Sequence, residues 1–389
     1  MKTLFIIDAY NLIYRMFYAI PEMHTRDGRV VNAIFGVAKF LKSLSDEHPH
    51  DSIVVATDVG QSFRATEYSE YKAQRDRMPD NLRSQIDGVF ALFQAAGIQI
   101  LSQEGYEADD LIGSIVTERS NGWTDYQFVI ISSDKDLCQF VQDGHVHIYD
   151  AMKQKFMKEK DVTEKFGVPT SQVRDYLAIV GDSSDNIPGI AGFGPKKATD
   201  LLQKYGTLEG IYENMGDLTP KMQEILRDQK ENAFLSQKLA TIIRDIKITL
   251  KLTEADTLVS HVSRSSYIEL LQEYQFRSLL PRGQEIVQKV LTKKEANVIK
   301  NLADIEKLQN LLGQKEVCTL AIDGDILGIS LDGEIYTIDS HVVDIVDFIT
   351  WLLGSEVEIR GYNLKEEYKK LLSIQKPLQR VSEGQRKLF

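Results

Sequence analysis

The chain has 389 residues, of which 43% are hydrophobic and 26% are charged. This length exceeds that of a typical single domain, and the composition excludes a disordered or fibrous protein, so we expect two or three globular domains. A formal net charge of −11 excludes a general nucleic-acid coat, which needs surplus Lys and Arg, but it is compatible with a site that collects acids around cations.

Short apolar runs alternate with helix-like stretches through the first half of the chain. The runs that we expect to be strands are 3–7, 52–57, 98–101, 127–131 and 145–149. The stretches with helical spacing of apolar residues are 32–45, 81–96, 108–118 and 135–141. This βαβ alternation predicts an α/β fold with a mostly parallel sheet flanked by helices, in which ligands bind beyond the carboxyl ends of the strands.

The second half of the chain has a different character. From about residue 169 the sequence predicts helices with one glycine-rich turn at 181–197, continuing to about 280. Residues 295–375 predict a small second α/β domain, with strands near 317–322, 326–330 and 334–338. We therefore expect a core at 1–168, a helical subdomain at 169–290, this second domain, and a flexible tail at 376–389.

The sequence gives no sign of a membrane or secretory segment. No run approaches the ~20 apolar residues that span a bilayer. Asp8 interrupts the apolar start too early for a signal peptide, so we expect a cytoplasmic protein. Cys138 and Cys318 lie in apolar stretches and are expected to be reduced core thiols without a role.

Acidic residues gather at the ends of the predicted strands and in the glycine-rich turn. They are Asp8, Asp58, Glu107, Asp109, Asp110, Asp134, Asp136, Asp182 and Asp185. A single Asp in such a place is more often a helix cap. Five clusters in this arrangement instead indicate divalent-cation ligands, because closely packed carboxylates repel unless cations neutralise them. Two-metal phosphodiester hydrolysis uses such ligands around ions about 3.5–4 Å apart.

Three motifs resemble a known family. Tyr-Glu-Ala-Asp-Asp at 106–110, Ser-Asp-Lys-Asp-Leu at 133–137 and Gly-Asp-Ser-Ser-Asp-Asn-Ile-Pro-Gly at 181–189 are similar to signatures of the 5′-nuclease domain of bacterial DNA polymerase I, in the flap endonuclease family. The resemblance covers about residues 1–285. It implies a PIN-like 5′-nuclease fold and a 5′→3′ exonuclease and flap endonuclease that uses two Mg²⁺ or Mn²⁺ ions. The first ion would be held by residues matching Asp8, Asp58, Glu107, Asp109 and Asp110, and the second by those matching Asp134, Asp136, Asp182 and Asp185.

The segment 62–79 interleaves aromatic and basic residues, which suits a channel for single strands. A solvated helix with i,i+4 charge pairs fits the composition equally well. The resemblance implies a helical arch at about 62–90, in which Lys72 and Arg75 approach the scissile phosphate as catalytic residues. Further residues that we expect to contact DNA are Phe63, Arg64 and Arg77 in this segment, and Tyr14 and Arg15 after Asp8.

The glycine-rich turn supplies a second DNA-binding candidate. Gly189, Gly192 and Gly194 precede a helix, where backbone N–H groups are free to bind phosphate. The turn resembles a helix–hairpin–helix element, which grips duplex DNA, can hold K⁺ on its carbonyls, and would gain phosphate contacts from Lys196 and Lys197. A helix connection without a ligand is the alternative.

Residues 295–375 resemble, over a shorter match around 361–365, a proofreading exonuclease domain of the RNase H-like kind. The active form of that domain needs an Asp-x-Glu pair, and Ala321-Ile-Asp-Gly-Asp325 has no glutamate, so we expect a degenerate domain. No stretch resembles a polymerase domain, so this chain is not expected to synthesise DNA unless it is a fragment of a longer polymerase. In the tail, Gln385, Leu388 and Phe389 resemble a sliding-clamp-binding peptide, with a random polar tail as the alternative.

The function expected from these features is hydrolysis at 5′ ends, flaps and nicks of DNA, and at RNA primers, by a monomer. Two alternatives are a non-catalytic DNA-junction binding module with structural metals, and a ribonuclease of the related fold.

Overall fold

The computed structural model describes residues 2–117, 126–253 and 255–280, and then 297–299, 301–314, 317–323, 326–331, 334–339, 345–355 and 357–361. The chain divides into two units, Met1–Leu279 and Leu280–Phe389, which we describe separately. Within the described ranges, no helix is both long and apolar enough to cross a membrane.

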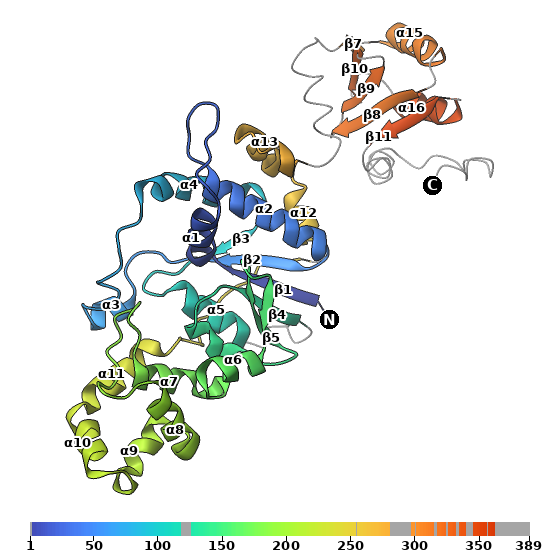
Figure 1. Ribbon diagram of the computed structural model, residues 1–389. Coiled ribbons are helices and arrows are strands. Elements are labelled where there is room, and N and C mark those ends of the chain that lie inside the picture. Colours follow the sequence, from blue (N-terminus) through green and yellow to red (C-terminus); the bar gives the residue numbers. More distant parts are fainter. Residues whose placement is uncertain are drawn as a thin grey trace. The chain divides into compact units, whose positions relative to one another are not determined.

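The first unit is built on a six-stranded sheet with the order β3-β2-β1-β4-β5-β6 (Figure 1). Its strands are β1 (Lys2–Asp8), β2 (Ser52–Ala56), β3 (Gln99–Leu101), β4 (Tyr126–Ile131), β5 (Val146–Asp150) and β6 (Lys155–Met157). Every neighbouring pair is parallel except β5 and β6. The predicted parallel α/β sheet is therefore confirmed, with its five expected strands and one additional edge strand.

Burial on both faces explains why the central strands are continuously apolar. All of Leu4–Ile7 is at most 1% exposed. Parallel strands covered by helices on both sides have this pattern. Helices α1 (Ala9–Ala19), α2 (Asn32–Glu47) and α4 (Asp80–Ala95) pack together on one face, and α5 (Ala108–Thr117) contacts β1 and β2 on the other (Figure 1).

The predicted helix at 135–141 is a short 3-10 helix, η2 (Asp136–Phe140). The helical part of the first unit then follows. It comprises α6 (Glu159–Phe166), η3 (Thr170–Gln172), α7 (Val173–Val180), α8 (Pro195–Tyr205), α9 (Leu208–Glu213), η4 (Met215–Asp217), α10 (Pro220–Asp228) and α11 (Lys230–Ala240). The chain returns to α2 and α4 through α12 (Leu258–Val262), α13 (Ser265–Glu273) and η5 (Arg277–Leu279).

The segment expected to form a helical arch is helical only at its ends. Helix α3 (Phe63–Glu67) is one short turn, and α4 begins at Asp80. Between them the chain forms turns and irregular structure rather than a continuous helix. Lys72 has φ = +57°, which a helix does not contain.

The second unit is the expected small α/β fold. Its five-stranded mixed sheet has the order β11-β8-β9-β10-β7. The strands are β7 (Asn297–Ile299), β8 (Val317–Asp323), β9 (Ile326–Leu331), β10 (Glu334–Asp339) and β11 (Glu358–Gly361), with helices α15 (Leu302–Leu312) and α16 (Ile345–Gly354). Gly324 and Asp325, residues 362–365 and the tail residues Gln385, Leu388 and Phe389 lie outside the described residues.

Candidate metal centre

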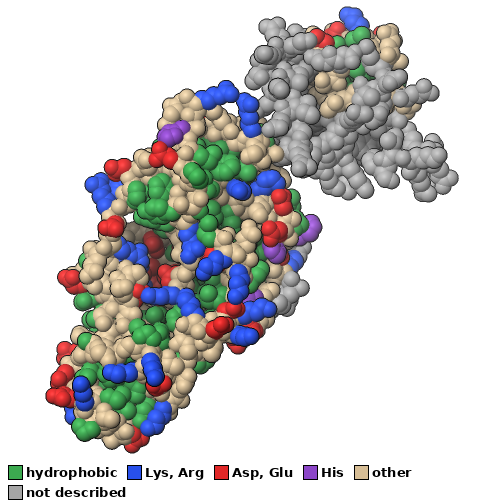
Figure 2. Space-filling model, in the orientation of Figure 1, with side chains coloured by type: hydrophobic (Ala, Val, Ile, Leu, Met, Phe, Trp, Pro, Cys, Tyr) green, Lys and Arg blue, Asp and Glu red, His purple; other side chains and the backbone are tan. Residues whose placement is uncertain are grey.

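The sheet topology brings the strand-end acids together. Because β1 lies between β2 and β4, the residues that follow these three strands meet at one edge. Asp8 ends β1 and accepts a 2.9 Å hydrogen bond from the Ser132 hydroxyl after β4. Asp58, after β2, accepts a 2.6 Å hydrogen bond from the Ala108 amide at the start of α5. Figure 2 shows acidic side chains at the base of a hollow on the visible face of this unit, between α3 and α4.

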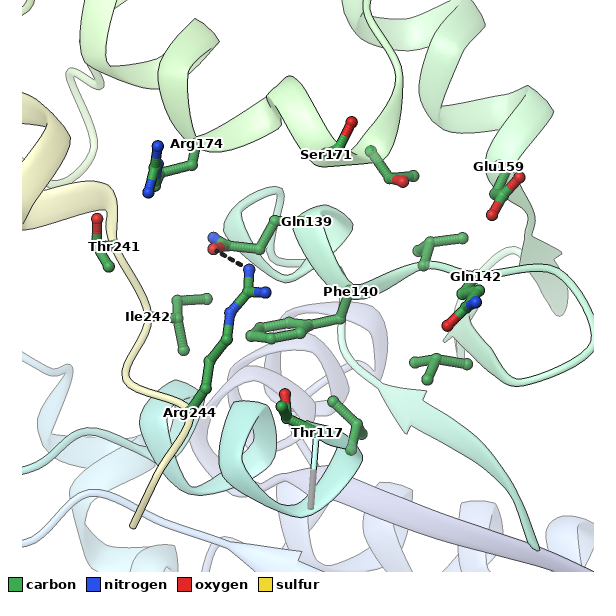
Figure 3. Close-up of a pocket in the computed structure, with 14 residues that line it drawn as sticks. Thr117, Gln139, Phe140, Gln142, Glu159, Ser171, Arg174, Thr241, Ile242 and Arg244 are labelled. Carbon is green, nitrogen blue, oxygen red and sulfur yellow. Dashed lines mark hydrogen bonds between the residues drawn. The ribbon is translucent and has the colours of Figure 1, made fainter. Parts of the chain in front are cut away.

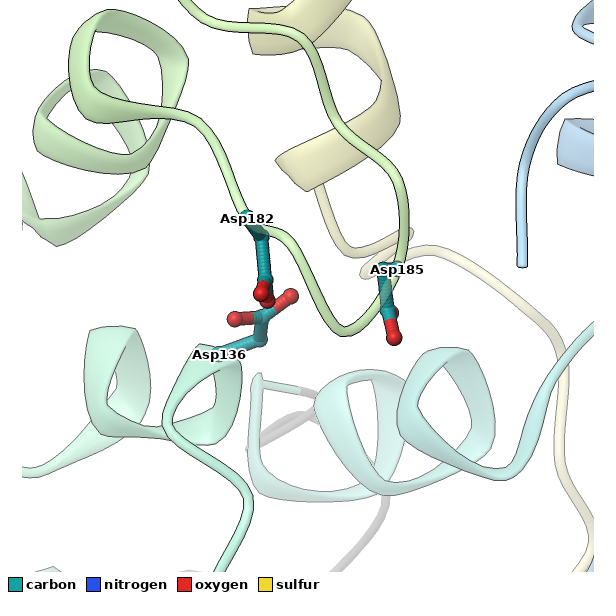
Figure 4. A group of neighbouring side chains, drawn as sticks. All are labelled: Asp136, Asp182 and Asp185. Atoms are coloured by element: carbon teal, nitrogen blue, oxygen red, sulfur yellow. The ribbon is translucent and has the colours of Figure 1, made fainter. Parts of the chain in front are cut away.

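A tighter group lies where η2 faces the loop after α7. Asp136, Asp182 and Asp185 each place a carboxylate oxygen within 4.8 Å of the others (Figure 4). All three residues are buried, and Oδ1 of Asp136 has no hydrogen-bond partner within the described structure. A buried carboxylate oxygen without a donor is costly unless a cation supplies the missing charge. Hard oxygen ligands from two elements fit a divalent metal ion.

The acids raise one another's pKa values, because closely packed carboxylates repel one another. Burial, followed by the charge of Asp134, raises the pKa of Asp8 to about 7. Burial and the charge of Asp134 also raise the pKa values of Asp109 and Asp136 well above the ordinary carboxyl value. Asp134 thus interacts with acids of both predicted ligand groups.

Asp182 differs from its neighbours in having cationic and hydroxyl partners. Burial would raise its pKa, but hydrogen bonds from the Lys135 ammonium, at 2.7 Å, and from Ser184 outweigh burial and lower it. Asp182 is therefore ionised more readily than an ordinary carboxyl group.

Both predicted catalytic residues, Lys72 and Arg75, contact predicted metal ligands. The Lys72 ammonium lies 2.9 Å from Oε1 of Glu107 and 3.8 Å from Oδ2 of Asp185. The Arg75 guanidinium donates a 2.7 Å hydrogen bond to Oδ1 of Asp185. The segment between α3 and α4 therefore lies against the predicted metal ligands, which we call the acid cluster (Asp8, Asp58, Glu107, Asp109, Asp134, Asp136, Asp182 and Asp185). It places the Lys72 ammonium and the Arg75 guanidinium beside Glu107 and Asp185. Carboxylate charge outweighs burial at Lys72 and raises its pKa, so the ammonium is retained.

Arg64 was expected to contact DNA, and the structure corrects this expectation. Its side chain is 2% exposed, and its guanidinium donates two 2.7 Å hydrogen bonds to the carboxylate of Asp110 and two more to the carbonyls of Leu239 and Thr241. These partners hold the guanidinium inside the protein. Asp110 also accepts hydrogen bonds from the amides of Glu107 and Ile243, so its oxygens are engaged by protein donors.

The other expected DNA contacts lie at the surface or close to it. Arg77 is exposed, and Tyr14 is half-buried beside Tyr18, with ring centroids 6.5 Å apart. The Arg15 guanidinium already has a partner within the protein, because it donates a 3.1 Å hydrogen bond to Asp150 at the end of β5. The Phe63 ring packs against the Arg64 guanidinium, whose Cζ lies 4.6 Å from the centroid of the ring.

The glycine-rich turn is stabilised by a contact within the turn itself. Gly189 and Gly192 have positive φ values of 66° and 87°, and Gly194 directly precedes α8. The Lys197 ammonium donates a 2.7 Å hydrogen bond to the Gly192 carbonyl, and both Lys196 and Lys197 are exposed. The turn thus presents a helix N-terminus and an exposed cation at the surface.

Sequence analysis missed Tyr71, Lys135 and Ser132 as members of the site. The Tyr71 hydroxyl lies 3.1 Å from Oε2 of Glu107 and 3.3 Å from Oδ2 of Asp185, and burial keeps its pKa raised, so the hydroxyl remains a donor. The signal was available, since Lys135 lies inside the Ser-Asp-Lys-Asp motif and Tyr71 directly precedes Lys72.

Comparison with known families gives two matches along the first unit. Residues 3–167 match the model for the 5′-3′ exonuclease, N-terminal resolvase-like domain. Residues 168–263 match the model for the 5′-3′ exonuclease, C-terminal SAM fold.

Individual relatives agree with these matches. The chain is 38% identical over 287 residues to a 5′-3′ exonuclease of Aquifex aeolicus, covering 74% of this chain and 96% of that protein. It is 38% identical over 336 residues to a DNA polymerase I of Caldicellulosiruptor bescii, covering 83% of this chain and 38% of the relative. The chain therefore spans about two fifths of the length of that polymerase.

Among solved structures, T5 5′-exonuclease with bound divalent zinc ions has a TM-score of 0.53 at 20% identity. The match covers 70% of this chain and 98% of the T5 protein. At this identity the likeness shows a shared fold.

Proposed function

Because the chain belongs to the 5′-3′ exonuclease family, we propose that it is a metal-dependent nuclease that hydrolyses phosphodiester bonds at 5′ ends, flaps and nicks of DNA. The observation that carries the proposal is the group of Asp136, Asp182 and Asp185, whose carboxylate oxygens lie within 4.8 Å of one another with one buried oxygen unpartnered. A binding module has no need for so many unneutralised acids beside a lysine and an arginine.

The acids divide into two ligand groups in this proposal. Asp8, Asp58, Glu107 and Asp109 face one ion, and Asp134, Asp136, Asp182 and Asp185 face the other, with Mg²⁺ or Mn²⁺ as the cations. Such ions lower the pKa of attacking water and neutralise charge on the leaving oxygen. Asp110 supports the first group through Arg64 and is a positioning residue rather than a ligand, because its oxygens already accept four protein hydrogen bonds.

Lys72 and Arg75 act on the scissile phosphate. Both are held at the acid cluster by carboxylates that would be shared with the metal ions. Once cations neutralise Glu107 and Asp185, the ammonium and guanidinium become available to an incoming phosphate, whose developing charge they stabilise. Tyr71 orients Glu107 and Asp185 by donating from its hydroxyl.

Further partners follow from the same proposal. Tyr14, Phe63 and Arg77 line the path by which the single strand approaches the acid cluster. The turn at Gly189, Gly192 and Gly194 binds phosphates of the duplex together with Lys196 and Lys197. The carbonyls of this turn hold a K⁺ ion. The enzyme acts in the cytoplasm as a monomer, accepts RNA primers as well as DNA, and binds a sliding clamp through Gln385, Leu388 and Phe389.

The test is cleavage of 5′-labelled flap, nicked and RNA-primed duplexes by the full chain with Mg²⁺ or Mn²⁺. We expect cleavage by the wild type and a rate at least about 10²-fold lower for Asp136→Asn, since a ligand to the reacting centre is lost. Glu104→Gln, which removes an exposed acid from the neighbouring loop, is the matched control and should cleave normally. Binding of flap DNA without cleavage by the wild type would refute the proposal, as would unchanged cleavage by Asp136→Asn.

A further inference from the structure

The first unit has a pocket that belongs to none of the sites above. It has a volume of about 720 Å³ and lies where η2, the C-terminal end of α5, the start of α7 and the segment after α11 meet (Figure 3). Gln139 and Phe140 of η2 line it, together with Arg174 of α7 and Arg244 of the segment after α11. A pocket of this size is in the range that holds small organic ligands.

Two guanidinium groups give the pocket its chemistry. Arg244 donates a 3.2 Å hydrogen bond to Oε1 of Gln139 and lies 4.7 Å above the Phe140 ring centroid. Within the described part of the chain, no carboxylate lies within ion-pair distance of Arg244. Arg174 is held at the pocket by Asp175, which accepts 3.0 and 2.9 Å contacts from it.

Arg174 and Arg244 line the same pocket. An anion bound in this pocket would be attracted by both positive charges. Glu159, the only acid among the lining residues described, has a carboxylate oxygen 3.3 Å from the Asp143 amide, which donates to it.

The remaining lining residues favour a phosphate with an apolar portion attached. Thr170 and Ser171 contribute hydroxyls at the beginning of the helical run that continues into α7, where hydroxyl and backbone donors suit an oxyanion. Val116, Val141 and Ile242 form an apolar wall beside Phe140. Guanidinium forks match the geometry of phosphate oxygens, and an aromatic and aliphatic wall suits a sugar or base.

We propose that this pocket is a second nucleotide site, which binds the phosphate of a nucleotide between Arg244 and Arg174. The phosphate is either that of a free nucleoside monophosphate or one within a DNA strand. The site is distinct from the acid cluster but shares η2 with it. Gln139 accepts a hydrogen bond from Arg244 and donates a 2.8 Å hydrogen bond to the backbone carbonyl of Asp136. A ligand that moves Arg244 would therefore also affect η2, the element that carries Asp136.

The experiment uses the full chain in metal-free buffer at constant ionic strength, so that the acid cluster takes no part in binding. Calorimetric titrations with inorganic phosphate, thymidine 5′-monophosphate and a single-stranded oligothymidylate are compared for four proteins. These are the wild type, Arg244→Gln, Ser171→Glu and the control Lys247→Gln. Lys247 is exposed, lies in the same segment as Arg244 and does not line the pocket. Ser171 and Arg244 are exposed, so their substitution is not expected to disturb folding.

We expect phosphate and the monophosphate to bind the wild type. Arg244→Gln should weaken that binding by about tenfold or more, as the loss of a charge-assisted contact does. Ser171→Glu should abolish it by placing an anion in the pocket, and Lys247→Gln should bind like the wild type. An oligonucleotide that loses affinity in parallel identifies the strand as the source of the phosphate, and an unaffected oligonucleotide identifies free nucleotides. Absence of phosphate binding, or equal binding by all four proteins, would overturn the proposal while leaving the nuclease activity to its own test.

Discussion

The guanidinium of Arg64 and the carboxylate of Asp110 form a bidentate ion pair in the interior of the first unit, with both hydrogen bonds at 2.7 Å. The Asp110 side chain is completely buried and that of Arg64 is 2% exposed. The pair joins α3 to the start of α5, and Arg64 also donates to the carbonyls of Leu239, at the end of α11, and Thr241, which follows that helix. The pair therefore joins α3, which precedes the segment that carries Lys72 and Arg75, to the start of α5, where Asp109 lies.

Removing the arginine alone should strongly destabilise the first unit. Arg64→Met leaves Asp110 charged and unpaired in the interior, which costs about 3–5 kcal/mol. The free energy of unfolding in urea measures this loss. Arg15→Met is the control, because the pair of Arg15 and Asp150 is partly exposed and should contribute less than about 1 kcal/mol.

The double variant Arg64→Met with Asp110→Leu separates charge from packing. It removes both partners of the ion pair and should recover part of the stability lost in the single variant. Equal losses for Arg64→Met and Arg15→Met would show that the interior pair does not have the proposed role.

Much of the fold was predictable because parallel strands buried on both faces must be continuously apolar. This apolar pattern predicted β1, β2 and β4, and therefore also the positions of the acids that follow them. Strand β6 was missed because its three residues are exposed or half-buried and carry no apolar pattern. The burial of Arg64 could not be predicted, since it depends on Asp110, 46 residues away, and composition alone does not distinguish a buried arginine from one that binds DNA.

In metal-free buffer the stability of the protein should fall as pH rises from about 4 to about 7. The folded pKa of Asp8 is about 7, above the ordinary value of 3.8, so between these values the folded state binds more protons than the unfolded state. Stability then decreases with pH. The pKa values of Asp109 and Asp136 are raised in the same direction. Thermal unfolding at a series of pH values measures the slope.

Two additions identify the acid cluster as the cause of this slope. Mg²⁺ binds the ionised folded state and should restore stability at neutral pH. Asp8→Asn should flatten the slope and stabilise the metal-free protein at pH 7.5 by up to about 4 kcal/mol, because the shift from 3.8 to about 7 is about three pKa units at about 1.4 kcal/mol each. Asn can still cap α1. Asp46→Asn, on the exposed face of α2, should leave the slope unchanged. A metal-free stability that rises through this pH range would contradict the prediction.

Lys72 and Arg77 should affect different steps of the reaction. The Lys72 ammonium lies at the acid cluster, so Lys72→Ala should lower the single-turnover cleavage rate by about 10²–10³-fold, as the loss of one preorganised donor does. Arg77 is exposed, so Arg77→Ala should weaken DNA binding and reduce the salt dependence of affinity by about one charge, with little change in the rate at saturation. Rapid-quench kinetics and binding at several salt concentrations separate the two effects. The assignment fails if both variants change only affinity.

Gly181 and Gly189 should prove essential to the loop that carries Asp182 and Asp185. Both have positive φ, and a Cβ on Gly189 would lie 2.5 Å from the Gly181 nitrogen, so the two backbones can approach only without side chains. Gly189→Ala should therefore displace the loop, lower stability by about 2 kcal/mol or more, and weaken divalent-metal binding. Gly194→Ala is the control, because a Cβ there meets no atom within 4 Å and φ is negative. Calorimetric Mn²⁺ titration and urea unfolding of both variants test the prediction, and similar metal affinities in the two would show that the close approach of the glycines does not shape the site.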